Sequence, residues 1–267
     1  MQKVKATVVV PTYKEVDNLR ALITRVFSSL DQTEWKGVTE MIIVDDNSKD
    51  GSEEVVKEME RKGYRVRMIV RENERGLSSA VLKGFEEAEG ELLVCMDADL
   101  QHPPEAVPLV LNSLISSSSS SPSVEFVIGT RYGGANSIDK DWPLYRRIFS
   151  WGARVLSRPL TSLSDPMSGF FGVHRSVLER GKKDLSGVGF KIGLEIYVKC
   201  RVSSFSEVPI VFGLRNAGYS KLSSKVMVLY LQHLVELYSF SYSLPVLIAV
   251  FLVFVTIVWT ILSKLLF

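Results

Sequence analysis

The chain has 267 residues, of which 32 are Lys or Arg and 30 are Asp or Glu, so its formal net charge is only +2. A charge so close to zero gives no electrostatic reason to expect a nucleic acid as partner. The chain contains two cysteines, Cys95 and Cys200, which excludes a disulfide framework. The length is sufficient for one large domain with an appendage.

The first part of the chain alternates short apolar runs with amphipathic segments. The predicted strands are 6–10, 40–44, 65–71 and 92–96, and the predicted helices are 18–30, 52–62 and 76–89. Such an alternation builds a mostly parallel sheet flanked by helices, in which ligands bind beyond the carboxyl ends of the strands. Polar residues follow three of the strands, at 11–15, 45–46 and 97–99. We therefore expect these three segments to share one site.

Two carboxylates, Asp97 and Asp99, follow the fourth predicted strand. Side chains two positions apart on an extended chain point the same way, so both carboxylates are aimed at one place. Pro103 and Pro104 turn the backbone and hold Gln101 close to the pair. Carboxylates this close repel each other unless a proton or a cation intervenes, and oxygen ligands favour Mg²⁺ or Mn²⁺. The residues alone leave open a plain polar strand end, or a role of Asp99 in capping the next helix.

The second part of the chain carries shorter elements and a serine tract at 116–121, which is typical of a surface loop. The predicted elements are a helix over 104–114, a strand over 125–128, partly basic and aromatic helices within 141–160, a short strand near 172, a helix from 190 and a strand over 207–215. Basic residues lie at or near the ends of several of these elements.

The C-terminal residues have the character of a membrane anchor. Residues 224–239 carry an apolar stripe that includes Val226, His233 and Leu237, as in a helix lying on a bilayer. Residues 244–262 contain no charge, and a helix of that length spans about 28 Å. We expect a cytosolic catalytic domain over 1–222, a membrane-interfacial amphipathic helix over 223–240 and a C-terminal transmembrane anchor over 241–267. A terminal anchor without a signal peptide would leave the domain in the cytosol.

Five motifs are the most specific features of the chain: VDDNS (44–48), NERGLSSAVLKG (73–84), MDADLQHPP (96–104), GTRY (129–132) and DPMSGFFG (165–172). Together they resemble the dolichyl-phosphate mannosyltransferases in their single-chain, tail-anchored form, a group of inverting family-2 glycosyltransferases. The resemblance implies an α/β GT-A (Rossmann-like) fold and metal-dependent transfer of mannose from GDP-mannose to dolichyl phosphate, with Mg²⁺ or Mn²⁺. It also implies an endoplasmic reticulum membrane location, a lipid bilayer as partner, and no obligatory partner subunit.

The same resemblance assigns roles to individual residues. The guanosine site would comprise Pro11, Tyr13, Glu15, Val44, Asp46 and Ala98, and the metal on the diphosphate would be held by Asp97, Asp99 and Gln101. Arg131, Lys191 and Arg215 would complete the nucleotide-sugar site and, with Asp99, form the catalytic set. Additional candidates, for the acceptor phosphate, are Arg147, Ser168 and Lys221. Fixed Arg and Lys side chains suit a reaction that brings together a diphosphate leaving group and a lipid phosphate.

Other interpretations stay open at this point. Taken singly, Tyr13 is also typical of a rim aromatic, the Asp45 and Asp46 pair of a solvated turn, and each basic residue of a solvated surface charge. A related function is transfer of glucose from UDP-glucose to the same lipid, although those enzymes typically place their span at the N-terminus. A function of another class is a non-catalytic, tail-anchored nucleotide-binding scaffold, against which the complete set of acidic and basic residues argues.

Overall fold

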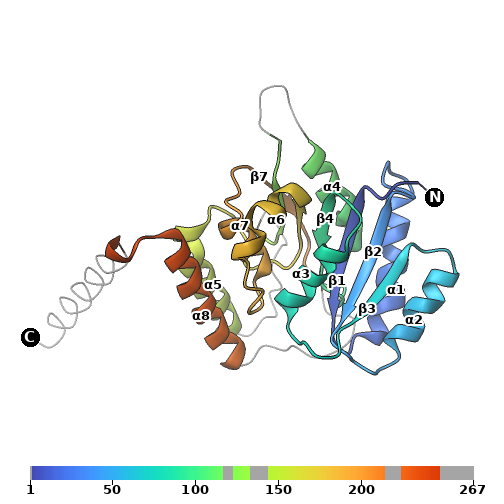
Figure 1. Ribbon diagram of the computed structural model, residues 1–267, viewed down its shortest axis with the longest axis horizontal. Helices are drawn as coiled ribbons and strands as arrows, with labels where there is room; N and C mark the ends of the chain where they lie inside the picture. The colour runs from blue at the N-terminus through green and yellow to red at the C-terminus, as the bar shows by residue number, and fades with distance from the viewer. Residues whose placement is uncertain (1, 117–122, 133–143, 214–223, 247–267) are drawn as a thin grey trace, which may run out of the picture.

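The computed structural model describes residues 2–116, 123–132, 144–213 and 224–246. Its strands form a seven-stranded sheet in the order β3-β2-β1-β4-β6-β5-β7 (Figure 1). Within this described sheet β6 runs antiparallel to both neighbours and the other strands run parallel, so the predicted mostly parallel α/β sheet is confirmed. The strands are β1 (Ala6–Thr12), β2 (Thr39–Asp45), β3 (Val66–Val70), β4 (Leu92–Cys95), β5 (Phe126–Thr130), β6 (Phe171–His174) and β7 (Phe205–Pro209).

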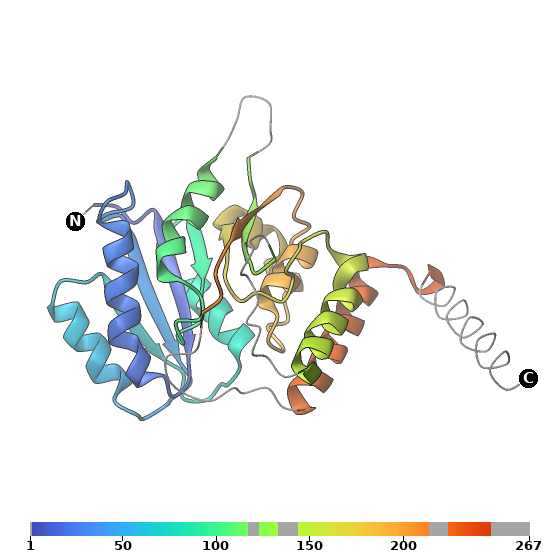
Figure 2. The same cartoon turned by 180° about the vertical axis from the view of Figure 1, so that it is seen from behind.

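Helices cover both faces of the sheet, which explains why the central strands are continuous apolar runs. Val8 and Val10 belong to the core beneath α1, α2 and α4, whereas Val9 points to the opposite core beneath α3, α6 and α7 (Figures 1 and 2). The helices are α1 (Val16–Leu30), α2 (Ser52–Arg61), α3 (Leu77–Glu87), α4 (Val107–Ile115), α5 (Leu144–Ser157), α6 (Arg175–Gly181), α7 (Ile192–Lys199) and α8 (Ser224–Ser241). Short 3₁₀ turns are η1 (Pro104–Ala106), η2 (Arg158–Leu160) and η3 (Lys182–Asp184).

Strand register places the polar segments together. Thr12 of β1 pairs with Asp45 of β2, and Val9 of β1 pairs with Cys95 of β4, so the three strands end side by side. Because β6 is reversed, the segment that precedes it, residues 165–170, lies at the same edge as the segments that follow the parallel strands. The expected shared site therefore has a physical basis, and the reversed strand adds a contribution that the chain order alone does not indicate.

Two elements differ from the sequence-based expectation. The strand predicted over 207–215 is β7, whose pairing with β5 runs only from Phe205 to Pro209. The short helix α6 was not predicted; it packs Val177 and Leu178 against the core. In both cases the bounds are set by contacts with segments distant in sequence, which local apolar spacing does not contain.

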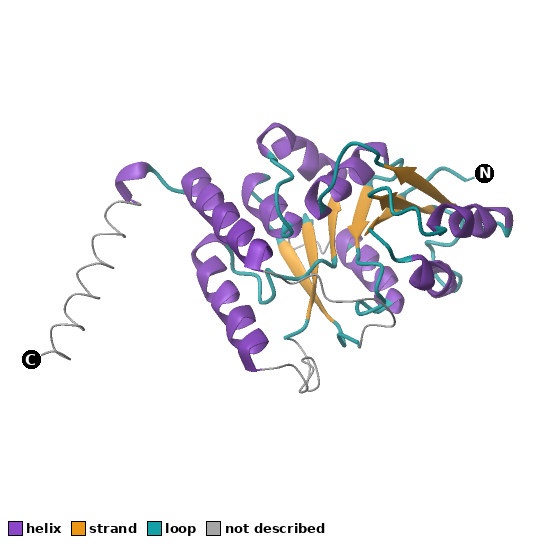
Figure 3. Ribbon diagram, turned by 90° about the horizontal axis from the view of Figure 1, so that it is seen from below, coloured by secondary structure: helices purple, strands orange, loops and turns teal. Residues whose placement is uncertain are grey.

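The helix predicted over 223–240 is present as α8, beside α5 at one end of the molecule (Figure 3). The stripe that we expected on a bilayer is largely turned inward, because His233, Leu234 and Leu237 are buried against the protein. A different row, Val228, Leu231 and Val235, is more than half exposed. Among the described residues, no helix is both long and apolar enough to cross a membrane. Most of the predicted anchor, residues 241–267, lies outside the described part of the chain.

Candidate active site

A cavity of about 430 Å³ lies at the carboxyl edge of the parallel strands. It is bounded by the segments after β1, β2 and β4, by the start of α3, by the residues before α7 and by the first turn of α8. The residues that line it are Pro11, Thr12, Tyr13, Glu15, Asp46, Arg75, Gly76, Leu77, Ala80, Asp97, Ala98, Asp99, Phe190, Lys191 and Val226. Eight of the residues assigned from the sequence therefore meet here: Pro11, Tyr13, Glu15, Asp46, Asp97, Ala98, Asp99 and Lys191.

The two carboxylates after β4 occupy different environments. Asp99 is buried, and its Oδ1 accepts the Gln101 N–H at 3.1 Å, whereas the Asp97 side chain is 37% exposed. Leu100 between Asp99 and Gln101 has a φ of 62°, a left-handed conformation that costs energy for a non-glycine residue. Such strain is maintained by the surrounding fold and is typical of functional sites. The tight turn fixes the backbone immediately after the carboxylate pair.

A glycine allows the loop before β6 to approach this pair. A Cβ added at Gly169 would lie 3.1 Å from Asp97 Oδ1 and 3.3 Å from Oδ2, closer than ordinary van der Waals contact. On the other side of Asp97, its N–H donates to His102 Nδ1 at 3.2 Å. Burial lowers the pKa of His102, in spite of the nearby Asp97 and Asp99 charges, so the ring is the neutral acceptor that this hydrogen bond requires. The ring stacks on Phe170, with 5.6 Å between centroids.

Arg131, after β5, is held by an acidic partner. Its Nε donates to Asp165 Oδ2 at 2.6 Å and its Nη2 donates to Oδ1 at 2.8 Å. The Asp165 side chain is 1% exposed and the Arg131 side chain 13%. Burial would raise the pKa of Asp165, but the hydrogen bonds and the charge of Arg131 outweigh it and hold that pKa below its ordinary value. This bidentate pair fixes the guanidinium plane near the loop that contacts Asp97.

Lys191, immediately before α7, extends into the cavity and donates from Nζ to the Met167 carbonyl at 2.7 Å. Burial, and then the positive charge of Arg131, lowers the pKa of Lys191, although the Asp97 and Asp165 charges act in the opposite direction. Lys191, Arg131, Asp97 and Asp165 thus form one electrostatically coupled group. Of its basic members, Lys191 lines the cavity beside the carboxylates, where it can oppose the charge of an anionic ligand.

On the opposite side of the cavity, Asp46 organises a loop. It forms an ion pair with Arg71, whose Nε donates at 2.8 Å, and it accepts the Gly76 N–H at 2.9 Å. Its neighbour Asp45 faces away, binding Thr12 and Ser48. The Asp46 contacts hold the segment 71–76 so that the Arg75 guanidinium lies 5.2 Å from the centre of the Tyr13 ring. An aromatic face with a cation over it, next to carboxylates, suits a nucleoside.

Other residues assigned from the sequence, Arg131 among them, are not part of the cavity lining. Val44 is fully buried in the core beneath α3 and does not line the cavity. Gln101 donates from Nε2 to the Gly213 carbonyl at 3.1 Å, and Ser168 binds the backbone of Phe170 within its own loop. Arg215 and Lys221 lie outside the described residues, and so does the side chain of Arg147.

The donor set at Asp97 and Asp99 fits a divalent cation shared with a ligand. Within the described residues no group of three or more His, Cys, Asp or Glu side chains could hold a metal ion by itself. Two carboxylates beside a cavity are nevertheless the protein contribution that Mg²⁺ and Mn²⁺ commonly receive when substrate phosphates supply further oxygens. The described residues at this edge of the sheet therefore suit a cation that is bound together with a ligand rather than by protein side chains alone.

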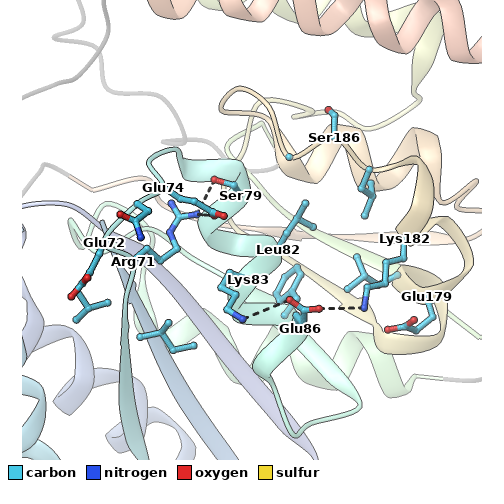
Figure 4. A pocket seen from close by; sticks show the side chains of 17 residues that line it. Arg71, Glu72, Glu74, Ser79, Leu82, Lys83, Glu86, Glu179, Lys182 and Ser186 are labelled. Atoms are coloured by element: carbon cyan, nitrogen blue, oxygen red, sulfur yellow. Dashed lines mark hydrogen bonds and ion pairs between the residues drawn. The ribbon is translucent and has the colours of Figure 1, made fainter. Parts of the chain in front are cut away.

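A second cavity, of about 580 Å³, lies between the end of β3, α3 and α6 (Figure 4). Its charges largely pair with one another, since Glu86 approaches Lys83 at 3.8 Å and Lys182 at 3.7 Å. Arg71 borders this cavity and donates to Ser79 Oγ at 2.8 Å. None of the site residues assigned from the sequence lines it. The first cavity, with its converging carboxylates and lysine, is the candidate active site.

Sequence reasoning missed Arg71, Arg75 and Asp165. Arg71 ends a predicted strand and Arg75 belongs to a quoted motif, so both carried a positional signal. Asp165 also lies in a quoted motif, but its partner Arg131 is 34 residues away, and only the antiparallel β6 brings the two together.

The fold is that of the α/β class whose members bind ligands at the carboxyl ends of the parallel strands, where the first cavity lies. The sequence profile described as Glycosyl transferase family 2 matches residues 7–181. The chain belongs to this family.

The chain is similar to two mannosyltransferases over most of its length. A "Dolichol-phosphate mannosyltransferase" from Mycosarcoma maydis is 52% identical over 262 residues, which are 95% of this chain and 87% of that protein. One from Saccharomyces cerevisiae is 51% identical over 245 residues, 90% of this chain and 89% of that protein. Among solved structures, glucosyl-3-phosphoglycerate synthase from Mycobacterium tuberculosis, in complex with Mn²⁺, UDP and phosphoglyceric acid, is 19% identical with a TM-score of 0.58. The match covers 88% of this chain and 78% of the synthase chain, and this similarity supports the assignment of the fold.

Proposed function

We propose that the protein transfers mannose from GDP-mannose to dolichyl phosphate with inversion, giving dolichyl β-D-mannosyl phosphate, the mannose donor for lumenal glycosylation and GPI-anchor assembly. The observation that carries the proposal is the convergence of Asp97, Asp99 and Lys191 in one cavity, in a chain half identical to two mannosyltransferases of that name. The relatives support the mannosyl transfer and the lipid acceptor. The guanine base, the cation and the residue roles are our assignments.

The donor would lie across the cavity. Tyr13 with Arg75 offers a face for the base, and Glu15, which lines the same cavity, would bind the ribose. Asp46, assigned from the sequence to guanosine, acts on it through the loop that carries Arg75. Asp97 and Asp99 would hold Mg²⁺ or Mn²⁺, with Gln101 and its side-chain oxygen as a third ligand. When bound, the cation neutralises charge on the diphosphate leaving group.

The chain's own charges would serve the departure of GDP. Lys191 and Arg131 oppose the charge that develops as the glycosidic bond breaks, and Arg215, outside the described residues, is proposed for the same set. The acceptor phosphate attacks the anomeric carbon from the face opposite to GDP. A phosphate monoester has a second pKa of about 6, so it is already an anion near neutral pH and needs no general base. Arg147, Ser168 and Lys221 remain proposed contacts for that phosphate.

The test is transfer of labelled sugar to a polyprenyl phosphate in detergent, with GDP-mannose compared with UDP-glucose. We expect metal-dependent transfer from GDP-mannose, and loss of it in Asp97→Asn and in Asp99→Asn. The matched control is Asp31→Asn, which removes an exposed carboxylate that pairs with Lys36 at 3.5 Å. Preference for UDP-glucose would contradict the donor, no transfer from either would favour a non-catalytic scaffold, and full activity of both variants at saturating Mn²⁺ would contradict the site.

We also propose that the enzyme works at the endoplasmic reticulum membrane, with its catalytic domain in the cytosol, a C-terminal anchor over 241–267 and no obligatory partner subunit. Support comes from the uncharged segment 244–262 and from the apolar side chains that α5 and α8 expose, namely Trp151, Val155, Val228, Leu231 and Val235. A polyprenyl acceptor lies in the bilayer, so tethering raises the rate of encounter.

Deletion from Leu244 onward tests this proposal. We expect it to weaken the use of a long-chain acceptor more than that of a short soluble analogue. Equal loss with both acceptors would count against it. In sealed microsomes, added protease should degrade the catalytic domain, and a protected domain would contradict the cytosolic orientation.

A further inference from the structure

A cluster of charged side chains is buried between α7 and α8, outside the candidate active site. Glu195 and Lys199 of α7 meet His233 and Glu236 of α8, and the exposed fractions of Glu195, Lys199 and His233 are at most 4%. The charges facing the cluster in the described structure are these four. Apolar residues of similar volume at such an interface are often at least as stabilising as a buried charge cluster, so stability alone does not account for it.

One oxygen of Glu195 holds the loop before α7. Glu195 Oε1 accepts the Ser186 N–H at 2.6 Å, the Ser186 hydroxyl at 2.9 Å and Lys199 Nζ at 2.8 Å. Lys199 also binds Glu236, which fixes its position from α8. Three donors on one carboxylate oxygen make a charge-assisted clamp on the first residue of the loop 186–190. Ser186 is labelled at the margin of the second cavity in Figure 4.

The other oxygen of Glu195 faces His233. Glu195 Oε2 lies 3.6 Å from His233 Nε2, and neither atom has a hydrogen-bond partner among the described residues. The histidine ring also covers the loop, because a Cβ added at Gly189 would lie 3.6 Å from His233 Nδ1. Gly189 has a φ of 91°, which favours glycine and lets the loop turn beneath the ring. Glu195 therefore binds the loop at Ser186, and the His233 ring packs over it at Gly189.

The loop continues directly into the candidate active site. The Gly189 carbonyl accepts the Ser78 hydroxyl of α3 at 2.9 Å, and the next two residues, Phe190 and Lys191, line the cavity. Lys191 Nζ then binds the Met167 carbonyl, and the Met167 side chain packs with α8. A displacement of Ser186 or Gly189 would be transmitted over two to five residues to the lysine that faces the donor phosphates.

We propose that Glu195 and His233 are positioning residues, which hold the loop 186–190 and through it set the position of Lys191 at the nucleotide site. This inference rests on the proposed function for the identity of the ligand. Neither residue touches the cavity, so neither is a catalytic residue. Their effect is exerted through Lys191.

The test is a double-mutant cycle read by direct binding. Isothermal titration of GDP with Mn²⁺ is carried out on the wild-type chain, Glu195→Gln, Lys191→Met and the double variant. Gln keeps the shape of Glu195 but removes the negative charge that binds the two Ser186 donors and Lys199. We expect the dissociation constant for GDP to rise about tenfold in Glu195→Gln, as for loss of a charge-assisted hydrogen bond. If Glu195 acts through Lys191, the double variant binds no more weakly than Lys191→Met alone.

Tyr238→Phe is the matched control, because it removes a hydrogen bond of α8 to the Leu156 carbonyl of α5, at 2.7 Å, without touching the loop. It should leave GDP binding unchanged, and His233→Leu should weaken it. Thermal melting separates binding effects from unfolding. Unchanged affinity in folded Glu195→Gln, or effects that multiply in the double variant, would overturn the inference. A wild-type chain that binds UDP but not GDP would overturn only the proposed donor, and the same cycle with UDP then decides the positioning role.

Discussion

Asp165 binds Arg131 through two parallel hydrogen bonds, Nε to Oδ2 at 2.6 Å and Nη2 to Oδ1 at 2.8 Å. The pair connects the end of β5 to the loop before β6. These two strands run in opposite directions. An arginine bound in this way keeps a fixed guanidinium orientation, whereas an unpaired arginine samples many rotamers. The carboxylate thus holds the guanidinium in the orientation that the role proposed for Arg131 requires.

Asp165→Asn should lower both stability and activity. It leaves the Arg131 charge without its anionic partner, and breaking a buried pair typically costs about 3 kcal/mol or more in free energy of unfolding. Urea unfolding measures the loss. The control is Glu105→Gln, which breaks an equally bidentate but exposed pair with Arg25, 2.8 Å for both bonds, and should cost no more than about 1 kcal/mol. Equal losses would contradict the special role of the Asp165 pair.

Gly169→Ala should weaken the cation site while the fold persists. The added Cβ would meet the Asp97 carboxylate at 3.1 Å, so that carboxylate must move by a few tenths of an ångström or rotate away. Misplacement of a reacting group is costly, and we expect kcat/KM to fall about tenfold or more, with a higher Mn²⁺ concentration needed for half-maximal activity. Gly152→Ala in α5, where an added Cβ meets nothing within 4 Å, serves as control. Unchanged Mn²⁺ dependence in Gly169→Ala would refute this account.

The pH dependence of donor use should report Lys191. Burial, and the charge of Arg131, lowers its pKa from 10.5. Below the lowered pKa the lysine is charged and attracts the diphosphate; as pH rises through it the charge is lost. The KM for the donor should therefore rise at a pH below 10.5. In Lys191→Arg the guanidinium stays charged up to about pH 12, so the KM should stay level across that range. A rise of the same size in both proteins would show that another group titrates.

Acid stability should depend on Glu125. The hydrogen bond from Arg180, assisted by Ser203, lowers the pKa of Glu125 from 4.5 to about 2. Because the folded carboxylate binds its proton more weakly than the unfolded one, its stabilisation is complete above pH 4.5 and disappears as pH falls toward about 2. Glu125→Gln should lower the free energy of unfolding near neutral pH by about 1 kcal/mol.

That difference between wild type and Glu125→Gln should shrink on acidification over the same range. Glu34→Gln, at an exposed position of the same charge, is the control and should show no such convergence. A difference that is constant with pH would mean that packing rather than ionisation is lost.

The sequence predicts the first half of the fold well, for a physical reason. Strands buried on both faces are continuous apolar runs, and polar residues follow them where the sheet ends, as Val94 and then Asp97 show. The direction of β6 is not locally encoded, because a short, largely buried strand of four residues can pair in either sense. The bounds of β7 likewise follow from its partner, β5.

The site was predictable where it follows strand ends and unpredictable where it depends on partners. Asp97 and Asp99 are visible from their spacing alone. The roles of Asp46 and Asp165 depend on Arg71 and Arg131, which lie 25 and 34 residues away. Val44 was assigned to the nucleotide by resemblance; its side chain is in the core beneath α3, so only its main chain is left for such a contact.

The reversed strand β6 has a consequence for how this chain can change over evolutionary time. The parallel strands that follow helices, β2, β3, β4, β5 and β7, all begin at the edge of the sheet opposite to the cavity. Lengthening the connection before such a strand leaves the chemistry in place. For β6 the rule inverts: the end away from the cavity is the one after His174, and an insertion between Asp165 and Phe170 would displace a glycine, a carboxylate and an aromatic ring at once. We therefore expect insertions to be tolerated poorly after the parallel strands and poorly before β6, because those are the ends that lie at the cavity.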